Sequence, residues 1–172
     1  MIQIRSNIFE TNSSSSHSLV VYREDKPLTT PVNGEWHVNN VGIMYLWEDH
    51  LTFGRGFDII TDWYGRACFA LASYADDERK RAEIEEILYK NVEGLKQIQY
   101  RGSWYDKPCY GYIDHQSAGL LQRFLETKNI SLYDFIFNDR YVVIIDGDEY
   151  NIFDTIRKLP SWNEDTVGVV YA

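Results

Sequence analysis

Residues 57–75 read FDIITDWYGRACFALASYA, and this stretch carries the clearest structural signal in the chain. Its apolar side chains recur three and four positions apart, at Ile59, Ile60, Trp63, Tyr64, Ala67, Cys68 and Leu71. This spacing places them along one side of an α-helix. We therefore predict a helix over 57–75 with one buried face.

A second helix is predicted directly after the first. The acidic run at 76–78 places negative charge where a helix begins, which the helix dipole favours. Gly94 is suited to ending this helix, which we expect to reach residue 92. Its buried stripe consists of Ile84, Ile87, Leu88 and Val92.

The remaining runs predict further helices at 117–128 and 132–137. Short strands are predicted at 2–4, 19–22, 36–38, 97–100, 110–113, 141–145 and 167–171. Asp146, Gly147 and Asp148 form a sequence typical of a hairpin turn. With no repeat or linker, the chain is expected to be one α+β domain over 1–172, a mostly antiparallel sheet packed by about three helices.

The charge of the chain limits the partners it can have. Its 26 acidic and 17 basic residues give a formal net charge of −9. A field of this sign repels nucleic acid at long range, so we expect no sequence-independent coating of free DNA or RNA. An acidic surface suits a basic partner, such as the groove of a nucleic-acid enzyme. The alternative is that the acidity only keeps a small protein soluble.

Aromatic residues are unusually abundant, with 13 Tyr, 8 Phe and 5 Trp making up 15% of the chain. One interpretation is a core and rim built from rings. The other is a recognition surface, because Tyr and Trp are enriched where partners or bases stack.

The chain has two cysteines, Cys68 and Cys109, which are too few for a disulfide framework or a zinc site. Cys68 lies in an apolar run and is predicted to be a small buried hydrophobe. The chain opens without a charged-then-apolar leader, and no apolar run reaches the roughly 18 residues of a membrane span. We expect a protein of the reducing cytoplasm, acting in the host cell and without membrane contact.

A first polar cluster occupies residues 5–18, between two apolar runs. A loop rich in Ser and Asn can direct donors toward a phosphate, and an imidazole with a pKa of about 6.5 suits proton transfer at neutral pH. The alternative is a flexible loop without chemistry. The residues predicted to act are Arg5, Glu10, Asn12, Ser13, Ser14, Ser15, Ser16 and His17.

A second polar cluster consists of Asp114, His115, Gln116 and Ser117, where a predicted strand leads into a predicted helix. Ser117 is a candidate N-cap for that helix. Asp114 is not expected to orient His115, because adjacent side chains on a strand point in opposite directions. The alternative is that His115 is a capping or core residue.

Residues 9–18, FETNSSSSHS, resemble the N-terminal signature of a family of small phage and mobile-element proteins. Residues 113–117, IDHQS, resemble a second motif of that family, and together the two motifs cover about a tenth of the chain. The family that the chain resembles is taken to include an anti-CRISPR protein. That protein acts on type II (Cas9) systems, and its effect involves truncation of the guide RNA. The resemblance therefore implies an anti-defence function, with Cas9 and its guide RNA as partners.

If RNA is cut, the two clusters allow a route without a metal ion. One of His17 and His115 would remove the proton from the ribose 2′-OH, and the other would protonate the leaving 5′-oxygen. Asn12, Ser14 and Ser15 would donate hydrogen bonds to the phosphorane, each worth about 2.7–4 kcal/mol. Arg5 would add positive charge.

Three alternatives stay open. Glu10, Asp114 and a histidine are of the right type to hold one divalent metal ion, Mg²⁺ or Mn²⁺, although no spacing requires it. A protein without catalysis could instead occupy a basic channel of an effector such as Cas9 and compete with DNA. A phage regulatory or structural protein without a host target is the third class.

Overall fold

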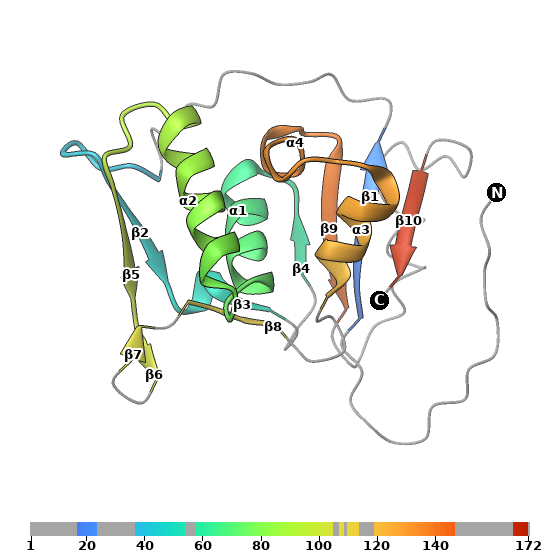
Figure 1. Cartoon of the computed structure of the whole chain (residues 1–172), viewed down its shortest axis with the longest axis horizontal. Helices are drawn as coiled ribbons and strands as arrows, with labels where there is room; N and C mark the ends of the chain where they lie inside the picture. The colour runs from blue at the N-terminus through green and yellow to red at the C-terminus, as the bar shows by residue number, and fades with distance from the viewer. Residues whose placement is uncertain are drawn as a thin grey trace.

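The computed structural model describes residues 17–23, 37–53, 58–104, 107–108, 110–113, 119–146 and 167–171. Figure 1 shows two of the helices lying between a four-stranded sheet and a separate pair of strands, and the other two lying against the sheet. The predicted α+β class is confirmed. The predicted strand at 2–4 and the turn residues Gly147 and Asp148 lie outside the described residues.

The main sheet is antiparallel throughout and has the strand order β10-β1-β9-β4. Its strands are β1 (His17–Arg23), β4 (Asp58–Ile60), β9 (Tyr141–Asp146) and β10 (Val167–Tyr171). The β-branched run of β9 is buried on both faces, with Val143 and Ile144 fully inaccessible. Such a run is favoured in a covered strand, because branched side chains pack well on a pleated surface.

The four described α-helices are α1 (Trp63–Ser73), α2 (Glu78–Asn91), α3 (Leu120–Lys128) and α4 (Leu132–Phe137). Three of them begin at a side chain that accepts a backbone N–H of the first turn. Asp62 accepts from Gly65, Asp77 from Lys80 and Ser131 from Asp134. These caps satisfy donors that would otherwise have no partner within the helix.

The first predicted helix was wrong in two respects. Residues 58–60 form strand β4, paired with β9, and the helix begins only after the cap at Asp62. The helix is also covered all round its middle, since every residue from Arg66 to Ala72 is buried. Small side chains such as Ala70 allow neighbours to approach it from several sides.

Three further corrections concern the start of α3 and two predicted strands. The N-cap of α3 is Gly119, in a left-handed conformation with φ of +80°, so Ser117 does not cap it. The strand predicted at 36–38 is reduced, within the described residues, to one isolated bridge between Val38 and Met44. The strand predicted at 110–113 is likewise shortened to two residues.

A parallel strand pair lies on the far side of α1 and α2 (Figure 1). It consists of β2 (Ile43–Trp47), which was not predicted, and β5 (Gln97–Arg101), which was. Met44 and Leu46 are buried on the helix side. A short 3₁₀ helix, η1 (Asp49–Leu51), follows β2.

Two small strand pairs complete the described fold. Strands β3 (Thr52–Phe53) and β8 (Tyr112–Ile113) pair in parallel, and β6 (Ser103–Trp104) pairs antiparallel with β7 (Lys107–Pro108). The β3–β8 pair lies beside α1 (Figure 1).

Candidate functional site

Most of the residues predicted to act lie outside the described residues. These are Arg5, Glu10, Asn12, Ser13, Ser14, Ser15, Ser16, Asp114, His115, Gln116 and Ser117. His17 is the first residue of β1, where its backbone is opposite Asp146 of β9. The pairing of His17 with His115 in one site therefore stays a prediction.

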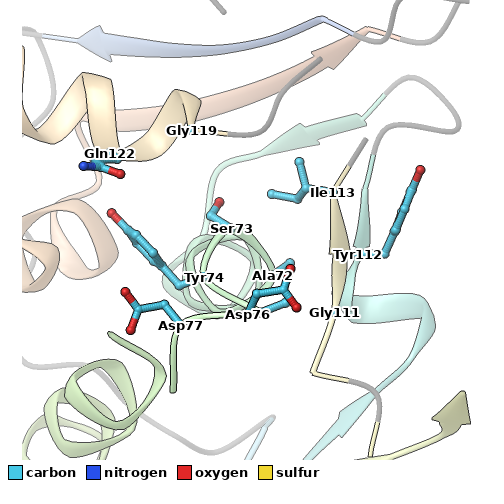
Figure 2. A pocket seen from close by; sticks show the side chains of 11 residues that line it. Ala72, Ser73, Tyr74, Asp76, Asp77, Gly111, Tyr112, Ile113, Gly119 and Gln122 are labelled. Carbon is cyan, nitrogen blue, oxygen red and sulfur yellow. The ribbon is translucent and has the colours of Figure 1, made fainter. Parts of the chain in front are cut away.

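The residues that flank the second cluster, Ile113 and Gly119, both line one cavity of about 600 Å³ (Figure 2). The cavity lies between the end of α1, the turn into α2, strand β8 and the start of α3. Its lining residues are Ala72, Ser73, Tyr74, Ala75, Asp76, Asp77, Gly111, Tyr112, Ile113, Gly119 and Gln122.

The local structure explains why the chain forms a hollow here. Tyr74 ends α1, and its backbone N–H bonds back to the carbonyls of Ala70 and Leu71. Asp77 starts α2 three residues later, so the chain turns sharply between the helices. Gly111 has a φ of +124° and lies so close to α1 that a Cβ there would be 2.7 Å from the Cα of Ala72.

The charge of the cavity is negative. Burial raises the pKa of the Tyr74 phenol, and the carboxylates of Glu126, Glu83 and Asp77 raise it further. The charged residues of the lining are Asp76 and Asp77. The negative dipole end of α1 opens on the same side, together with the positive amino ends of α2 and α3, so the helix dipoles largely offset one another and the two carboxylates set the sign. The described lining therefore favours a cation and disfavours a phosphate.

The polar groups of the cavity are arranged around Tyr74. Its hydroxyl points toward the side chain of Gln122 on α3, while Asp76 and Asp77 lie near the end of α1 (Figure 2). Gln122 donates from Nε2 to Glu126 at 2.9 Å. An ammonium or guanidinium group entering here would meet carboxylates, an amide oxygen and a phenol.

A second polar group, missed from the sequence, joins His37, His50 and Tyr64. The imidazole of His37 stacks on the Tyr64 ring, with centroids 3.8 Å apart and planes 1° apart. The Tyr64 hydroxyl donates to the Tyr45 carbonyl at 3.1 Å and lies 2.8 Å from Nδ1 of His50. His37, His50 and Tyr64 are separated by 13 and 14 positions in the chain, so local residue pattern carried little signal for this cluster.

The Tyr64 hydroxyl joins the exposed imidazole of His50 to the Tyr45 carbonyl in one hydrogen-bonded group. Burial lowers the pKa of His37, with Asp62 opposing and His50 reinforcing this effect.

Thiol chemistry is not expected at Cys68. The residue is buried in α1, as predicted, and burial raises the pKa of its thiol to about 12. A thiol reacts as the thiolate, which is scarce at neutral pH when the pKa is this high. Among the described residues, no group of three His, Cys, Asp or Glu side chains could hold a metal ion.

Comparison with known proteins identified no related protein. No protein-family model matches the chain, and no curated protein or solved structure matches it. Within the described part of the chain, no helix combines the length and apolar character needed to cross a bilayer.

Proposed function

We propose that the protein is an anti-defence protein of a phage or mobile element that inhibits a Cas9-type effector in the host cytoplasm. Its acidic cavity, with Asp76 and Asp77 in the lining, receives basic side chains from the nucleic-acid channel of the effector. The observation that carries the binding mode is the negative environment of Tyr74. The resemblance of residues 9–18 supports the anti-defence part of the proposal.

The charge of the whole chain supports the same mode of action. A net charge of −9 attracts a protein whose channel is built to hold nucleic acid. Complementary charge mainly speeds association and excludes wrong partners, and its effect weakens as salt rises. Inhibition by occupancy is therefore expected to be strongest at low ionic strength.

Cleavage of the guide RNA is the second candidate. The observation in its favour is that Ile113 and Gly119 both line the cavity. These two residues lie on either side of the Asp114–Ser117 cluster in the sequence. In this mode His17 and His115 act as the acid–base pair. The carboxylates around Tyr74 would oppose a phosphate in the described part of the cavity, so they favour occupancy over cleavage.

One experiment separates the two modes. Purified protein is incubated with Cas9 and labelled guide RNA, with and without EDTA. RNA integrity is followed on denaturing gels, and binding of target DNA is followed by fluorescence anisotropy. We expect intact RNA, loss of DNA binding, and weaker inhibition at high salt. Cleavage of the RNA by the parent protein, together with loss of cleavage in His17→Ala or His115→Ala, would show that the protein acts by catalysis and not by occupancy.

Matched variants test the cavity itself. Asp76→Asn with Asp77→Asn removes two charges, and asparagine at 77 still caps α2. We expect inhibition to weaken about twofold to thirtyfold, from about 0.2–1 kcal/mol per exposed charge. Glu86→Gln with Glu93→Gln removes the same charge from exposed positions outside the cavity lining and serves as the control. Equal inhibition by both double variants would exclude the cavity as the contact surface.

A further inference from the structure

The outer face of the β2–β5 pair presents exposed aromatic and cationic side chains. Trp47 of β2 is directly opposite Arg101 of β5 in the register, and both point away from the helices. Trp47 is 50% exposed, an unusual accessibility for a large apolar ring. Tyr45, two residues before it, presents its ring on the same face, with its centroid 6.4 Å from that of Trp47.

Arg101 is held in place before any ligand arrives. Its guanidinium carbon lies 4.7 Å above the centroid of the Tyr45 ring, and Nη2 donates to Gln99 at 2.8 Å. Within the described residues these two contacts use one face of the guanidinium and one of its five N–H donors. A guanidinium that is already ordered loses less entropy on binding an anion than a free one.

A cavity of about 450 Å³ lies beside this pair. Its lining residues are Trp47, Glu48, Asp49, Thr52, Arg101 and Gly102. Gly102 has a φ of +129°, and a Cβ there would be 2.9 Å from Cβ of Glu48, so the Glu48 side chain lies against this turn. Asp49 uses Oδ1 to accept the backbone N–H of His50 at 3.2 Å.

We propose that this cavity binds a guanine nucleotide, with the base stacked on the indole of Trp47 and the phosphate bound by Arg101. The Watson–Crick edge of guanine offers two adjacent donors, N1–H and N2–H, which match a carboxylate. Asp49 supplies that carboxylate, and Glu48 adds negative charge beside it. Adenine offers an acceptor at N1, which a carboxylate repels.

The arrangement of the side chains, rather than their net charge, selects this occupant over a basic peptide, since the lining holds two carboxylates and one guanidinium. A lysine or arginine side chain could stack on Trp47 and pair with Asp49, but Arg101 in the same lining would repel it. A nucleotide satisfies the indole, the cation and the carboxylate together. The site is distinct from the acidic cavity at Tyr74, and its test does not depend on Cas9.

Isothermal titration calorimetry on the full chain tests the proposal. The probes are GMP, AMP, guanosine, and two five-nucleotide RNAs that carry one G or one A among uridines. We expect one saturable site that prefers GMP over AMP and over guanosine. Tighter binding of the G-containing RNA than of GMP would identify a strand as the source of the nucleotide, and tighter binding of GMP would identify the free nucleotide.

Variants identify the residues involved. Trp47→Ala and Arg101→Gln are each expected to weaken GMP binding at least about fivefold, since a stacked base or a charge-assisted contact contributes on that scale. Asp49→Asn is expected to reduce the preference for GMP over AMP. Tyr133→Ala and Arg79→Gln change an exposed aromatic and an exposed arginine away from the cavity and are expected to bind as the parent does.

Three results would overturn the proposal. The first is the absence of saturable binding by GMP and by the G-containing RNA. The second is unchanged binding in both Trp47→Ala and Arg101→Gln, with folding verified by circular dichroism. The third is equal affinity for GMP and AMP, which would remove the guanine assignment. Arg101→Gln lies on an exposed surface, so it remains informative even if Trp47→Ala is unstable.

Discussion

Arg66 of α1 is a charged residue whose side chain is fully buried, so its guanidinium needs hydrogen-bond acceptors inside the protein. Its guanidinium donates to the carbonyls of Ile136 at 2.8 Å, Thr61 at 2.7 Å and Tyr141 at 3.1 Å, and to Asp139 at 3.0 Å. Burial lowers its pKa, and the hydrogen bond and charge of Asp139 oppose that shift. The arginine thus joins α1 to the end of α4 and the start of β9.

Arg66→Met is predicted to lower the free energy of unfolding by about 3–5 kcal/mol, because the buried carbonyls of Ile136 and Tyr141, the carbonyl of Thr61 and the carboxylate of Asp139 lose their donor. Urea denaturation followed by circular dichroism measures the change. Arg79→Met, on the exposed face of α2, is the control and should stay within about 0.5 kcal/mol of the parent. Similar losses in both variants would contradict the structural role of Arg66.

His37 gives a pH-dependent prediction at the same scale. Its pKa is lowered in the folded state, chiefly by burial, so the unfolded chain binds the proton more readily. The stability that depends on neutral His37 is complete above the unfolded pKa of about 6.5 and is lost as pH falls below that value. His37→Phe keeps a ring to stack on Tyr64 but has no proton to bind.

The measurement is urea denaturation of the parent and His37→Phe at about pH 7.5 and about pH 5. The parent should lose more stability than the variant over this range. Carboxylates titrate in both proteins, so their contribution cancels in the difference. A difference that does not change with pH would show that His37 does not carry the effect.

At the scale of elements, glycines decide how closely the β8 region approaches α1. Gly111 and Gly94 both have positive φ, but only Gly111 has neighbours that a Cβ would meet, at Ala72 and Leu51. Gly94 has nothing within 4 Å. Gly94 therefore reports backbone strain alone, whereas Gly111 combines backbone strain with a steric clash.

Gly94→Ala is predicted to lower the free energy of unfolding by about 1–2 kcal/mol, from the left-handed conformation alone. Gly111→Ala should be more damaging by a further 1–3 kcal/mol or so, because the added methyl group overpacks the contact with α1. Thermal and urea unfolding of both variants measure the cost of the backbone strain and the additional cost of the methyl contact with α1. Equal destabilisation would mean that the backbone of Gly111 can move away from α1 without cost.

At the scale of the whole molecule, the central position of α1 organises the fold. The four-stranded sheet lies on one side of α1 and α2 and the β2–β5 pair on the other (Figure 1). The acidic cavity lies at the carboxyl end of α1, and the Trp47–Arg101 cavity lies on the outside of the strand pair. The two proposed binding surfaces are therefore built by different elements and can be tested separately.

The local residue pattern was sufficient to predict much of the secondary structure. Helix α2 and its acidic start, the short helix α4 and the apolar strand β9 follow from periodicity, capping and β-branched residues, which act within a few positions of the chain. The burial of Cys68 also followed from its apolar neighbours. These features depend on residues close in sequence, so the sequence by itself determined them.

Tertiary structure decided the rest. Residues 58–60 continue the apolar pattern of α1, but pairing with β9 makes them a strand, and contacts from several elements bury α1 on all sides. The clusters of Arg66 with Asp139 and of His37 with His50 and Tyr64 join residues far apart in the chain. No local pattern encodes such contacts, because they depend on which surfaces of distant elements fit together.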